Sequence, residues 1–383
     1  MKLHEATLHM TDTQTMLRDS LQRYLDEQYD FEARSRALAA AVHEPPQLWQ
    51  GLANDLGILG ASLPEQWGGL GGGAMENQLI MELLGGALAG EPYLSTVVIG
   101  GGLLSRVGGS MAERLIPRII DGTAVFAFAH VESPGHFDLA DVRTTLSHEG
   151  NALCVNGRKA VVHGAPWATH LIITARGTDT SNHDMSVLLI DRDTPGVVMR
   201  EYPTRDGGRA AEIRFDQVRV ARDALLGDEG SALPLLEEVI DEATLAVCAE
   251  AIGAMRRLMR DTLEYARERK QFGAPLASFQ ALQHRMADMY IALEQADALT
   301  QSVASCLDKL GPQRTRAVSS AKVAVCKACR NVGQGAVQIH GAMGMTEELA
   351  IGHYFRRTTV IESLFGSLDY HVRRYERLDP AFA

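Results

Sequence analysis

The spacing of apolar residues changes twice along the chain. Over residues 12–38, and again over 48–59, apolar side chains recur every three or four positions, which is the pattern of amphipathic helices. Pro45 and Pro46 separate these two segments. Residues 74–120 are rich in Ala, Leu, Met and Glu, with glycines at the expected helix junctions. We therefore predict a first helix over 12–38 and a wholly helical first part of the chain.

A second pattern begins near Thr123. Short runs rich in β-branched residues follow, separated by Gly, Asp and Asn turns, as expected for strands. These runs cover residues 124–132, 142–164, 170–176, 185–203 and 212–220. Helical spacing returns after Gly227 and continues to the C-terminus. We predict an α+β protein with a helical domain at 1–122, a β domain at 123–227 and a second helical domain at 228–383.

Charge and length narrow the range of partners. The formal net charge is −11 and the pI is about 5.6, so the overall balance does not favour binding to nucleic acid or to an anionic membrane. Apolar stretches such as 96–104 are far shorter than the roughly 20 residues that span a bilayer. The first residues do not resemble a secretory signal. We expect a cytoplasmic protein without a nucleic-acid or membrane partner.

The chain has an odd number of cysteines, which argues for reduced thiols rather than a disulfide framework. They are Cys154, Cys248, Cys306, Cys326 and Cys329. The last two form a C-x-x-C motif, but they lie in a helical pattern without a second Cys or His pair at zinc-binding spacing. We interpret them as two small residues on one helix face, and we predict no metal site.

Residues 265–283, YARERKQFGAPLASFQALQ, place basic, aromatic and amide side chains around one abrupt turn. Pro275 forbids simple continuation of the helical run that precedes it. At such a corner Arg269 is able to offer its guanidinium to an anion in two-point geometry, and Phe272 offers an apolar face. Gln280 opens the next helix with a donor and an acceptor. Taken alone, the stretch is also compatible with a solvated basic helix end.

This stretch resembles the R-x-x-F-G...Q motif of the acyl-CoA dehydrogenases, which are FAD flavoproteins. In that family the arginine, phenylalanine and glutamine reach across a subunit interface to the pyrophosphate and adenosine part of the partner's FAD. The resemblance assigns cofactor contacts to Arg269, Gln271, Phe272 and Gln280. It also implies a chain that is at least dimeric.

Two further segments resemble the same family. The glycine-rich segment 62–73, SLPEQWGGLGGG, is similar to its P-E-x-x-G-G-x-G element; a Rossmann loop is not expected, because no strand pattern leads into the segment. Residues 338–342, QIHGA, are similar to its Q-x-x-G-G element, so Gln338, Gly341 and Ala342 are expected at the adenosine half of FAD. The resemblance covers essentially the whole chain. It implies an N-terminal α-helical domain, a middle β domain and a C-terminal four-helix-bundle domain.

The segment that usually carries the catalytic base differs from the family. Family members remove an α-proton of an acyl-CoA with a carboxylate while hydride leaves the β-carbon for the flavin. This glutamate usually lies in a Y-E-G-T segment, which corresponds here to residues 364–367, LFGS. Phe365 stands at the glutamate position and cannot accept a proton. Ser367 is assigned to the cofactor site by the same resemblance.

Some family members carry the base on the first helix of the C-terminal domain instead. That position is Ala243 here, with Glu242 directly before it. An offset of one residue turns a helical side chain by about 100°, so Glu242 need not point at the substrate. We name Glu242 as the candidate base, with an acidic residue on a solvated helix face as the more common explanation. Glu250 is a weaker candidate.

The β domain departs from the family as well. Its T-E-P-x-A-G-S-D loop, which holds the flavin ring, corresponds to residues 131–138, VESPGHFD, with Val131 and Phe137 where hydroxyl residues are expected. The W-I-T strand end that stacks on the isoalloxazine corresponds to residues 161–163, VVH. His163 is able to hydrogen-bond a flavin nitrogen or carbonyl. The stacking tryptophan has no substitute at Val161.

Elements that hold the adenine end of FAD for a neighbouring subunit are thus kept, whereas those that hold the ring and remove the proton are altered. This pattern resembles the small, non-basic subunit of two-component enzymes such as pimeloyl-CoA and steroid side-chain acyl-CoA dehydrogenases, which form α2β2 assemblies. The resemblance implies a homologous acyl-CoA dehydrogenase subunit and an electron-transfer flavoprotein as partners. It favours a bulky, alicyclic, steroid-derived or dicarboxylic acyl-CoA as substrate.

Two other hypotheses remain open. A self-sufficient homo-oligomeric dehydrogenase would use Glu242 as the base and His163 as a flavin contact. A flavin-free structural subunit would keep the fold for assembly alone. Mutation of Glu242 distinguishes the first of these, and mutation of Arg269 distinguishes the second.

Overall fold

The computed structural model describes residues 10–40, 45–133, 137–178, 184–307 and 311–378. The chain divides into two compact units. One comprises Met1–Arg34, Ala74–Ala89 and Thr244–Ala383, and the other Ser35–Gly73 and Gly90–Ala243. Each unit joins segments that are distant in sequence, so neither depends on local contacts alone.

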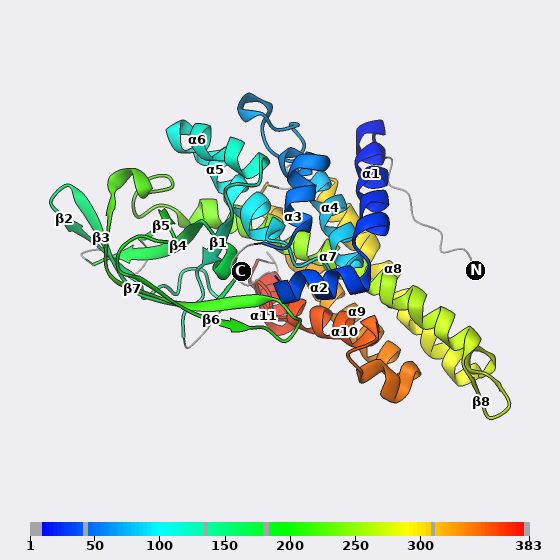
Figure 1. Cartoon of the computed structure of the whole chain (residues 1–383). Coiled ribbons are helices and arrows are strands. Elements are labelled where there is room, and N and C mark those ends of the chain that lie inside the picture. The colour runs from blue at the N-terminus through cyan, green and yellow to red at the C-terminus, as the bar shows by residue number, and fades with distance from the viewer. Residues whose placement is uncertain (1–9, 41–44, 134–136, 179–183, 308–310, 379–383) are drawn as a thin grey trace. The chain divides into compact units, whose positions relative to one another are not determined.

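Helices precede and follow a central run of strands, which confirms the predicted α-β-α order (Figure 1). The first group is α1 (Asp12–Gln28), α2 (Phe31–Ala40), α3 (Leu48–Gln50), α4 (Ala74–Gly86), α5 (Gly102–Val107) and α6 (Gly109–Ile120). Short 3₁₀ or π segments lie at Gly51–Asp55, Ile58–Gly60, Glu65–Trp67 and Leu94–Gly101. The second group is α7 (Leu233–Glu268), α8 (Gln280–Ala304), α9 (Arg314–His340), α10 (Ala350–Ile361) and α11 (Leu368–Arg377). Among the described residues, no helix is both long enough and apolar enough to cross a membrane.

The single helix predicted over residues 12–38 is wrong, because the chain breaks there into α1 and α2. Tyr29 leaves helical geometry with φ −135° and ψ 62°. The carboxylate of Asp30 then accepts the Ala33 N–H at 2.6 Å and begins a new helix. A short acidic side chain that caps its own downstream backbone competes with helix continuation, and the apolar spacing does not reveal this competition.

The central segment forms one mixed seven-stranded sheet in the order β1-β4-β2-β3-β7-β6, with β5 paired to β4. Its strands are β1 (Phe126–Ala129), β2 (Thr145–Glu149), β3 (Ala152–His163), β4 (His170–Gly177), β5 (Met185–Asp191), β6 (Val197–Pro203) and β7 (Arg209–Ala221). Strands β1 and β2 lie parallel to β4, and the other pairs are antiparallel. On β7, Ile213 and Phe215 are buried while Glu212 and Arg214 are exposed, so one face of the strand packs on the core.

Helix α9 is the central element of the C-terminal helices, since it packs against α8, α10 and α11. Its apolar residues Val325, Val332, Ala336 and Ile339 are buried within the chain. The apolar stripe of α9 therefore supplies the core of its own domain.

The glycine-rich segment 62–73 contains the short 3₁₀ turn Glu65–Trp67 and leads directly into α4. A 3₁₀ helix, Ile58–Gly60, precedes it in place of a strand. This local structure confirms that the segment is not a Rossmann phosphate-binding loop, because that motif requires a strand before the glycines.

Candidate functional site

The chain turns sharply where α7 ends. Strands β8 (Lys270–Gln271) and β9 (Ala274–Pro275) pair as a small hairpin, and the Leu276 N–H donates to the Arg269 carbonyl at 2.9 Å. Phe272 lies in the turn with a φ of 54°. The predicted corner is confirmed, and Figure 1 shows the hairpin beyond the adjoining ends of α7 and α8.

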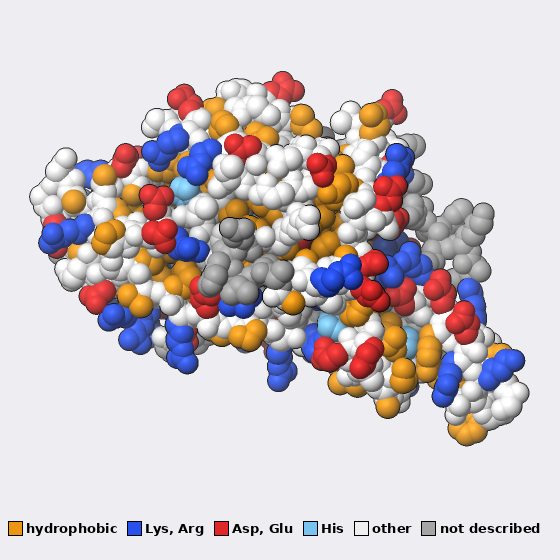
Figure 2. All heavy atoms as spheres, in the orientation of Figure 1, with side chains coloured by type: hydrophobic (Ala, Val, Ile, Leu, Met, Phe, Trp, Pro, Cys, Tyr) orange, Lys and Arg blue, Asp and Glu red, His pale blue; other side chains and the backbone are white. Residues whose placement is uncertain are grey.

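The side chains at this hairpin face solvent. Phe272 is 93% exposed, and its ring meets the edge of the Phe279 ring with the centroids 6.3 Å apart. Arg269, Gln271 and Gln280 are also exposed. Figure 2 shows hydrophobic and basic side chains together at this end. The ring of Phe272 is therefore accessible to another molecule.

The second predicted cofactor element lies at the end of α9. Gln338 is exposed in the last turn, and Gly341 ends the helix with φ 62° and ψ −141°. A Cβ atom on Gly341 would meet nothing within 4 Å, so the backbone is open to the close approach of a ligand. Ala342 is exposed in the following 3₁₀ segment, Gly341–Met345.

One contact joins these two elements, and it was not predicted from the sequence. The rings of Tyr265 on α7 and His340 on α9 stack with centroids 4.2 Å apart and an interplanar angle of 22°. Tyr265 lies one turn before Arg269, and His340 lies two residues after Gln338. Both rings lie within the recognised segments, but the spacing along one helix carries no information about contacts with another.

The strand end that aligns with W-I-T carries a strained backbone. Val161 has a φ of 51° and is 46% exposed, and the pairing of β3 with β7 shifts register between Lys159 and Val162. A positive φ is costly for a β-branched residue and occurs mainly at functional sites. His163 ends β3 opposite Ala210, at the predicted strand end.

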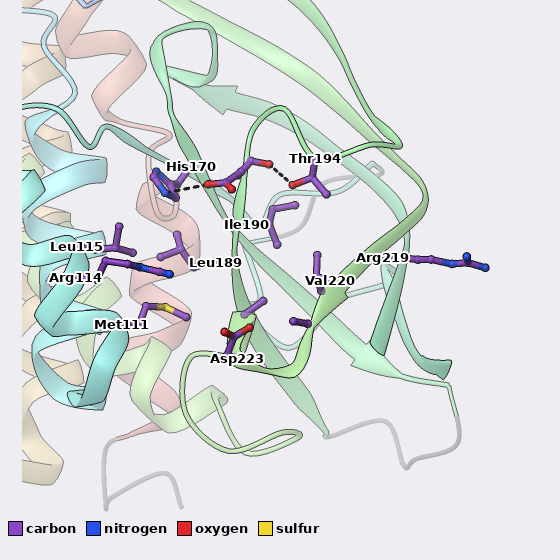
Figure 3. Close-up of a pocket in the computed structure, with 13 residues that line it drawn as sticks. Met111, Arg114, Leu115, His170, Leu189, Ile190, Thr194, Arg219, Val220 and Asp223 are labelled. Carbon is purple, nitrogen blue, oxygen red and sulfur yellow. Dashed lines mark hydrogen bonds and ion pairs between the residues drawn. The ribbon is translucent and has the colours of Figure 1, made fainter. Parts of the chain in front are cut away.

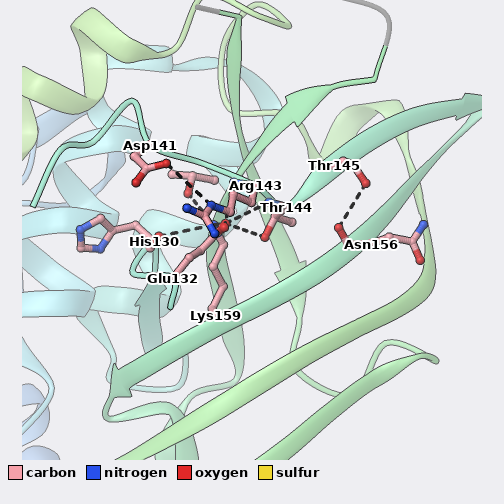
Figure 4. Close-up of polar contacts among 9 residues, drawn as sticks. His130, Glu132, Asp141, Arg143, Thr144, Thr145, Asn156 and Lys159 are labelled. Atoms are coloured by element: carbon pink, nitrogen blue, oxygen red, sulfur yellow. Dashed lines mark hydrogen bonds and ion pairs between the residues drawn. The ribbon is translucent and has the colours of Figure 1, made fainter. Parts of the chain in front are cut away.

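A buried ion pair lies below this strand end. The Nζ of Lys159 is fully buried and donates to Glu132 at 2.6 Å and to the Thr174 hydroxyl at 2.8 Å (Figure 4). Burial alone would raise the pKa of Glu132, but attraction to Lys159 and hydrogen bonds from its neighbours lower it. Burial also lowers the pKa of Lys159, to about 8, which leaves the ammonium charged at neutral pH.

The same carboxylate closes the loop that aligns with T-E-P-x-A-G-S-D. Glu132 accepts the backbone N–H groups of Arg143 and Thr144 at 2.8 and 3.0 Å (Figure 4). Glu132 therefore connects the two ends of the segment that runs from Glu132 to Thr144. Residues 134–136 of the predicted flavin loop lie outside the described residues.

The segment at the usual base position is hydrogen-bonded to a buried histidine. Phe365 has a φ of 56°, and its carbonyl accepts the Nε2–H of the fully buried His371 at 3.1 Å. Burial, with the nearby Lys322, lowers the pKa of His371 to about 3, so this imidazole is neutral. Ser367 begins α11, where its hydroxyl accepts the Tyr370 N–H at 3.3 Å.

Both candidate carboxylates on α7 have arginine partners. Glu242 is 13% exposed and forms an ion pair with Arg106, whose Nε lies 3.6 Å from Glu238. Glu250 is 4% exposed, and its two oxygens accept from Arg357 at 2.5 and 2.9 Å. Each carboxylate is therefore engaged in an ion pair within the chain.

The cysteines do not form a reactive or metal-binding cluster. All five are free thiols, and Cys326 and Cys329 are buried on α9. Burial raises the pKa of both thiols and that of Cys248, in the last case to about 12. No group of His, Cys, Asp and Glu among the described residues is arranged to hold a metal ion.

A separate cavity of about 270 Å³ lies against α6 and the strands β4, β5 and β7 (Figure 3). Arg114 and His170 contribute to its lining. Burial lowers the pKa of His170, so the neutral ring donates from Nε2 to Asp191 at 3.1 Å and accepts the Thr169 hydroxyl at 2.7 Å. The imidazole is thus satisfied within the fold, and none of the predicted cofactor residues lines this cavity.

Matches to known proteins agree with the fold. The chain matches the acyl-CoA dehydrogenase N-terminal, middle and C-terminal domain models over residues 11–123, 127–218 and 233–377. It is 30% identical over 308 residues to the caffeyl-CoA reductase-Etf complex subunit CarC of Acetobacterium woodii, covering 78% of this chain and 81% of that protein. It is 29% identical over 317 residues to the probable acyl-CoA dehydrogenase YngJ of Bacillus subtilis, covering 80% and 83%. The chain belongs to the acyl-CoA dehydrogenase family.

Solved structures lead to the same assignment. The Tcur3481-Tcur3483 steroid ACAD has a TM-score of 0.86 and 28% identity, covering 96% of this chain and 97% of that chain. The ChsE4-ChsE5 complex from Mycobacterium tuberculosis has a TM-score of 0.87 and 24% identity, with the same coverage, and shows the shared fold. The family consists of FAD flavoproteins, oxidoreductases that act on the CH–CH group of acyl-CoA thioesters.

The two halves of FAD fit this chain unequally. The exposed guanidinium of Arg269, the exposed ring of Phe272 and the open backbone at Gly341 suit a pyrophosphate and an adenosine. At the positions predicted for the ring half, Val161 offers no aromatic surface, and His163 offers only an imidazole. The residues present therefore fit the adenosine half better than the flavin half.

Proposed function

We propose that this chain is the non-basic subunit of a heteromeric, FAD-dependent acyl-CoA dehydrogenase. It completes the FAD site of a homologous catalytic subunit in trans. The observation that carries the proposal is the contrast between Phe272, which is 93% exposed at an intact adenosine-binding hairpin, and Phe365 at the usual base position. Bound FAD supplies the hydride acceptor for α,β-desaturation of the acyl-CoA thioester.

In this proposal the chain binds and orients the adenosine end. The Arg269 guanidinium pairs with the pyrophosphate through charge-assisted hydrogen bonds. Phe272 covers an apolar face of the adenosine, and the amides of Gln280 and Gln338 donate and accept around it. Gly341 allows the ligand to lie against the backbone. Gln271 and Ala342 border the same surface.

The proton-abstracting carboxylate then belongs to the other subunit. Phe365 has no acidic group, and Glu242 is held by Arg106. The proposal keeps His163 and Ser367 as predicted contacts of the flavin end, although Ser367 also caps α11.

Similarity supports the choice of substrate and partners. The Tcur3481-Tcur3483 steroid ACAD is 28% identical to this chain, and the name of CarC includes Etf. The proposal accordingly includes a bulky, steroid-like or alicyclic acyl-CoA as substrate and an electron-transfer flavoprotein as electron acceptor. It also includes a cytoplasmic location, with which five free cysteines are compatible.

The visible absorption spectrum tests the division of labour. The chain is purified alone and then together with a homologous acyl-CoA dehydrogenase subunit. The proposal expects a colourless chain alone and a flavin band only with the partner. A yellow chain that bleaches with an acyl-CoA in the absence of any partner would overturn the proposal.

Point variants separate the two alternatives. If the chain is a self-sufficient enzyme, Glu242→Gln abolishes turnover and leaves bound flavin in place. If the chain is a flavin-free structural subunit, Arg269→Ala has no effect on the FAD content of the reconstituted complex. The heteromeric proposal expects the opposite pattern, with FAD lost in Arg269→Ala and turnover retained in Glu242→Gln.

A further inference from the structure

A ring stack connects the two predicted cofactor-binding elements, the hairpin after α7 and the end of α9. Tyr265 and His340 stack face to face with ring centroids 4.2 Å apart. The carbonyl of Tyr265 accepts the Arg269 N–H at 2.8 Å, so the tyrosine forms the base of the hairpin. His340 is the last residue of α9 and directly precedes Gly341.

The histidine ring has a defined seat. His340 is 5% exposed, and its Nδ1–H donates to the Ala336 carbonyl at 2.9 Å. The following 3₁₀ segment folds back on it, so that a Cβ on Gly344 would lie 3.0 Å from the His340 Cβ. Burial lowers the pKa of His340, so the ring stacks in its neutral form. The hydrogen bond to Ala336, the backbone that folds back and the stacked tyrosine together restrict the orientation of the His340 ring.

The predicted cofactor contacts beside this ring stack face solvent. Arg269 and Gln338 are exposed, and the space beside Gly341 is open. A ligand that spans both elements needs them at a set distance, and contacts between α7 and α9 determine that distance. The stack is such a contact at the very end of both helices.

We propose that Tyr265 and His340 are positioning residues. They keep the Arg269 hairpin and the Gln338–Gly341 element at a set distance from each other. In this way both elements bind the pyrophosphate and adenosine of one FAD. The inference rests on the proposed function, because it takes FAD as the ligand. Neither ring needs to touch the cofactor. The stack uses the ring face of Tyr265, so the proposal does not require its hydroxyl.

Flavin selectivity tests the inference, because FMN lacks the adenosine half of FAD. Dissociation constants for FAD and FMN are measured by flavin fluorescence on the reconstituted assembly, together with the thermal unfolding midpoint. Tyr265→Leu and His340→Leu are expected to weaken FAD binding about three- to tenfold, the range of one aromatic pair, and to leave FMN binding unchanged. Tyr265→Phe is expected to restore FAD affinity.

A matched control uses another ring pair in the helical domain. Phe31 meets the His353 ring edge-on with centroids 4.9 Å apart. Phe31→Leu removes an aromatic ring that contacts a histidine, in this case edge-on, and leaves the predicted cofactor elements unchanged. It is expected to shift the unfolding midpoint as Tyr265→Leu does and to leave the FAD-to-FMN ratio unchanged.

Three results are decisive. Equal weakening of FAD and FMN in Tyr265→Leu, or unchanged FAD binding, overturns the positioning role. If Arg269→Ala loses FAD while Tyr265→Leu does not, the proposed function survives and the positioning role alone fails. If Arg269→Ala keeps full FAD affinity, the proposed function itself fails.

Discussion

Gly253 on α7 packs directly against the carbonyl oxygen of Glu82 on α4. A Cβ atom at Gly253 would lie 1.8 Å from that oxygen, far inside contact distance. Gly85 makes the reciprocal approach, since its Cβ would lie 2.0 Å from the Glu250 carbonyl oxygen. Two glycines therefore allow the backbones of α4 and α7 to touch.

This contact predicts that Gly253→Ala is strongly destabilising. The added methyl group meets backbone, which cannot rotate away, so the helices must separate. We expect a loss of about 3 kcal/mol in the free energy of unfolding, measured by urea denaturation. Gly73→Ala is the control, since its Cβ would meet nothing within 4 Å, and we expect a change within about 0.5 kcal/mol. Similar stability of the two variants would contradict the close approach.

The two bidentate arginine pairs on α10 should differ in their effect on stability. Glu250 is 4% exposed beside Arg357, whereas Glu347 is 70% exposed beside Arg356. Glu250→Gln removes the buried carboxylate that pairs with the partly exposed Arg357, and we expect a loss of about 3 kcal/mol on urea denaturation. Glu347→Gln should cost less than about 1 kcal/mol, because water screens that pair. Equal losses would show that burial is not the deciding factor.

The buried imidazole of His371 predicts a loss of stability in acid. Its pKa is about 3 in the folded chain and near 6.5 when unfolded, so only the unfolded state takes up a proton between these values. The contribution is complete above about pH 6.5 and falls by roughly 1.4 kcal/mol per pH unit below it. We expect the stability difference between wild type and His371→Gln to shrink by about 2 kcal/mol from pH 7 to pH 5. If this stability difference does not change with pH, protonation of His371 in the unfolded state does not account for the loss of stability in acid.

Substitution of Phe272 should weaken FAD binding and leave the free energy of unfolding nearly unchanged. Because the ring is 93% exposed, Phe272→Ser is expected to change the free energy of unfolding by less than about 0.5 kcal/mol. The FAD affinity of the reconstituted assembly should fall up to about tenfold, since one aromatic face is lost. Met16→Ser, at a residue 70% exposed on α1, provides the control and should change neither quantity. Unaltered FAD binding in Phe272→Ser would remove this ring from the site.

Val161, Phe272 and Phe365 are three of the five described non-glycine residues with a positive φ; the other two, Leu88 and Gln217, lie outside the predicted cofactor positions. Val161, Phe272 and Phe365 all have φ values between 51° and 56°, which side chains other than glycine rarely adopt. They stand at the flavin-stacking, adenosine and base positions of the family pattern. Strain of this kind persists only where the surrounding structure enforces it.

Much of the architecture followed from local properties of the chain. The change of apolar period near Thr123 and after Gly227 predicted the order of helices and strands, because burial on one face imposes that period. Pro275 predicted the corner after α7, since proline and glycine act on their own backbone. The residue types of the hairpin, Arg269 and Phe272 among them, identified the family before any contact was known.

Contacts between distant residues were decided by the tertiary structure alone. The pairing of Glu242 with Arg106, and the stack of Tyr265 on His340, join positions far apart in the sequence. Helical spacing states which side of its own helix a residue occupies, but not what packs against that side. Whether a carboxylate is paired, or a ring is seated, depends on that packing. For this reason the sequence predicted candidate residues of the site, and only the fold showed which of them pack together.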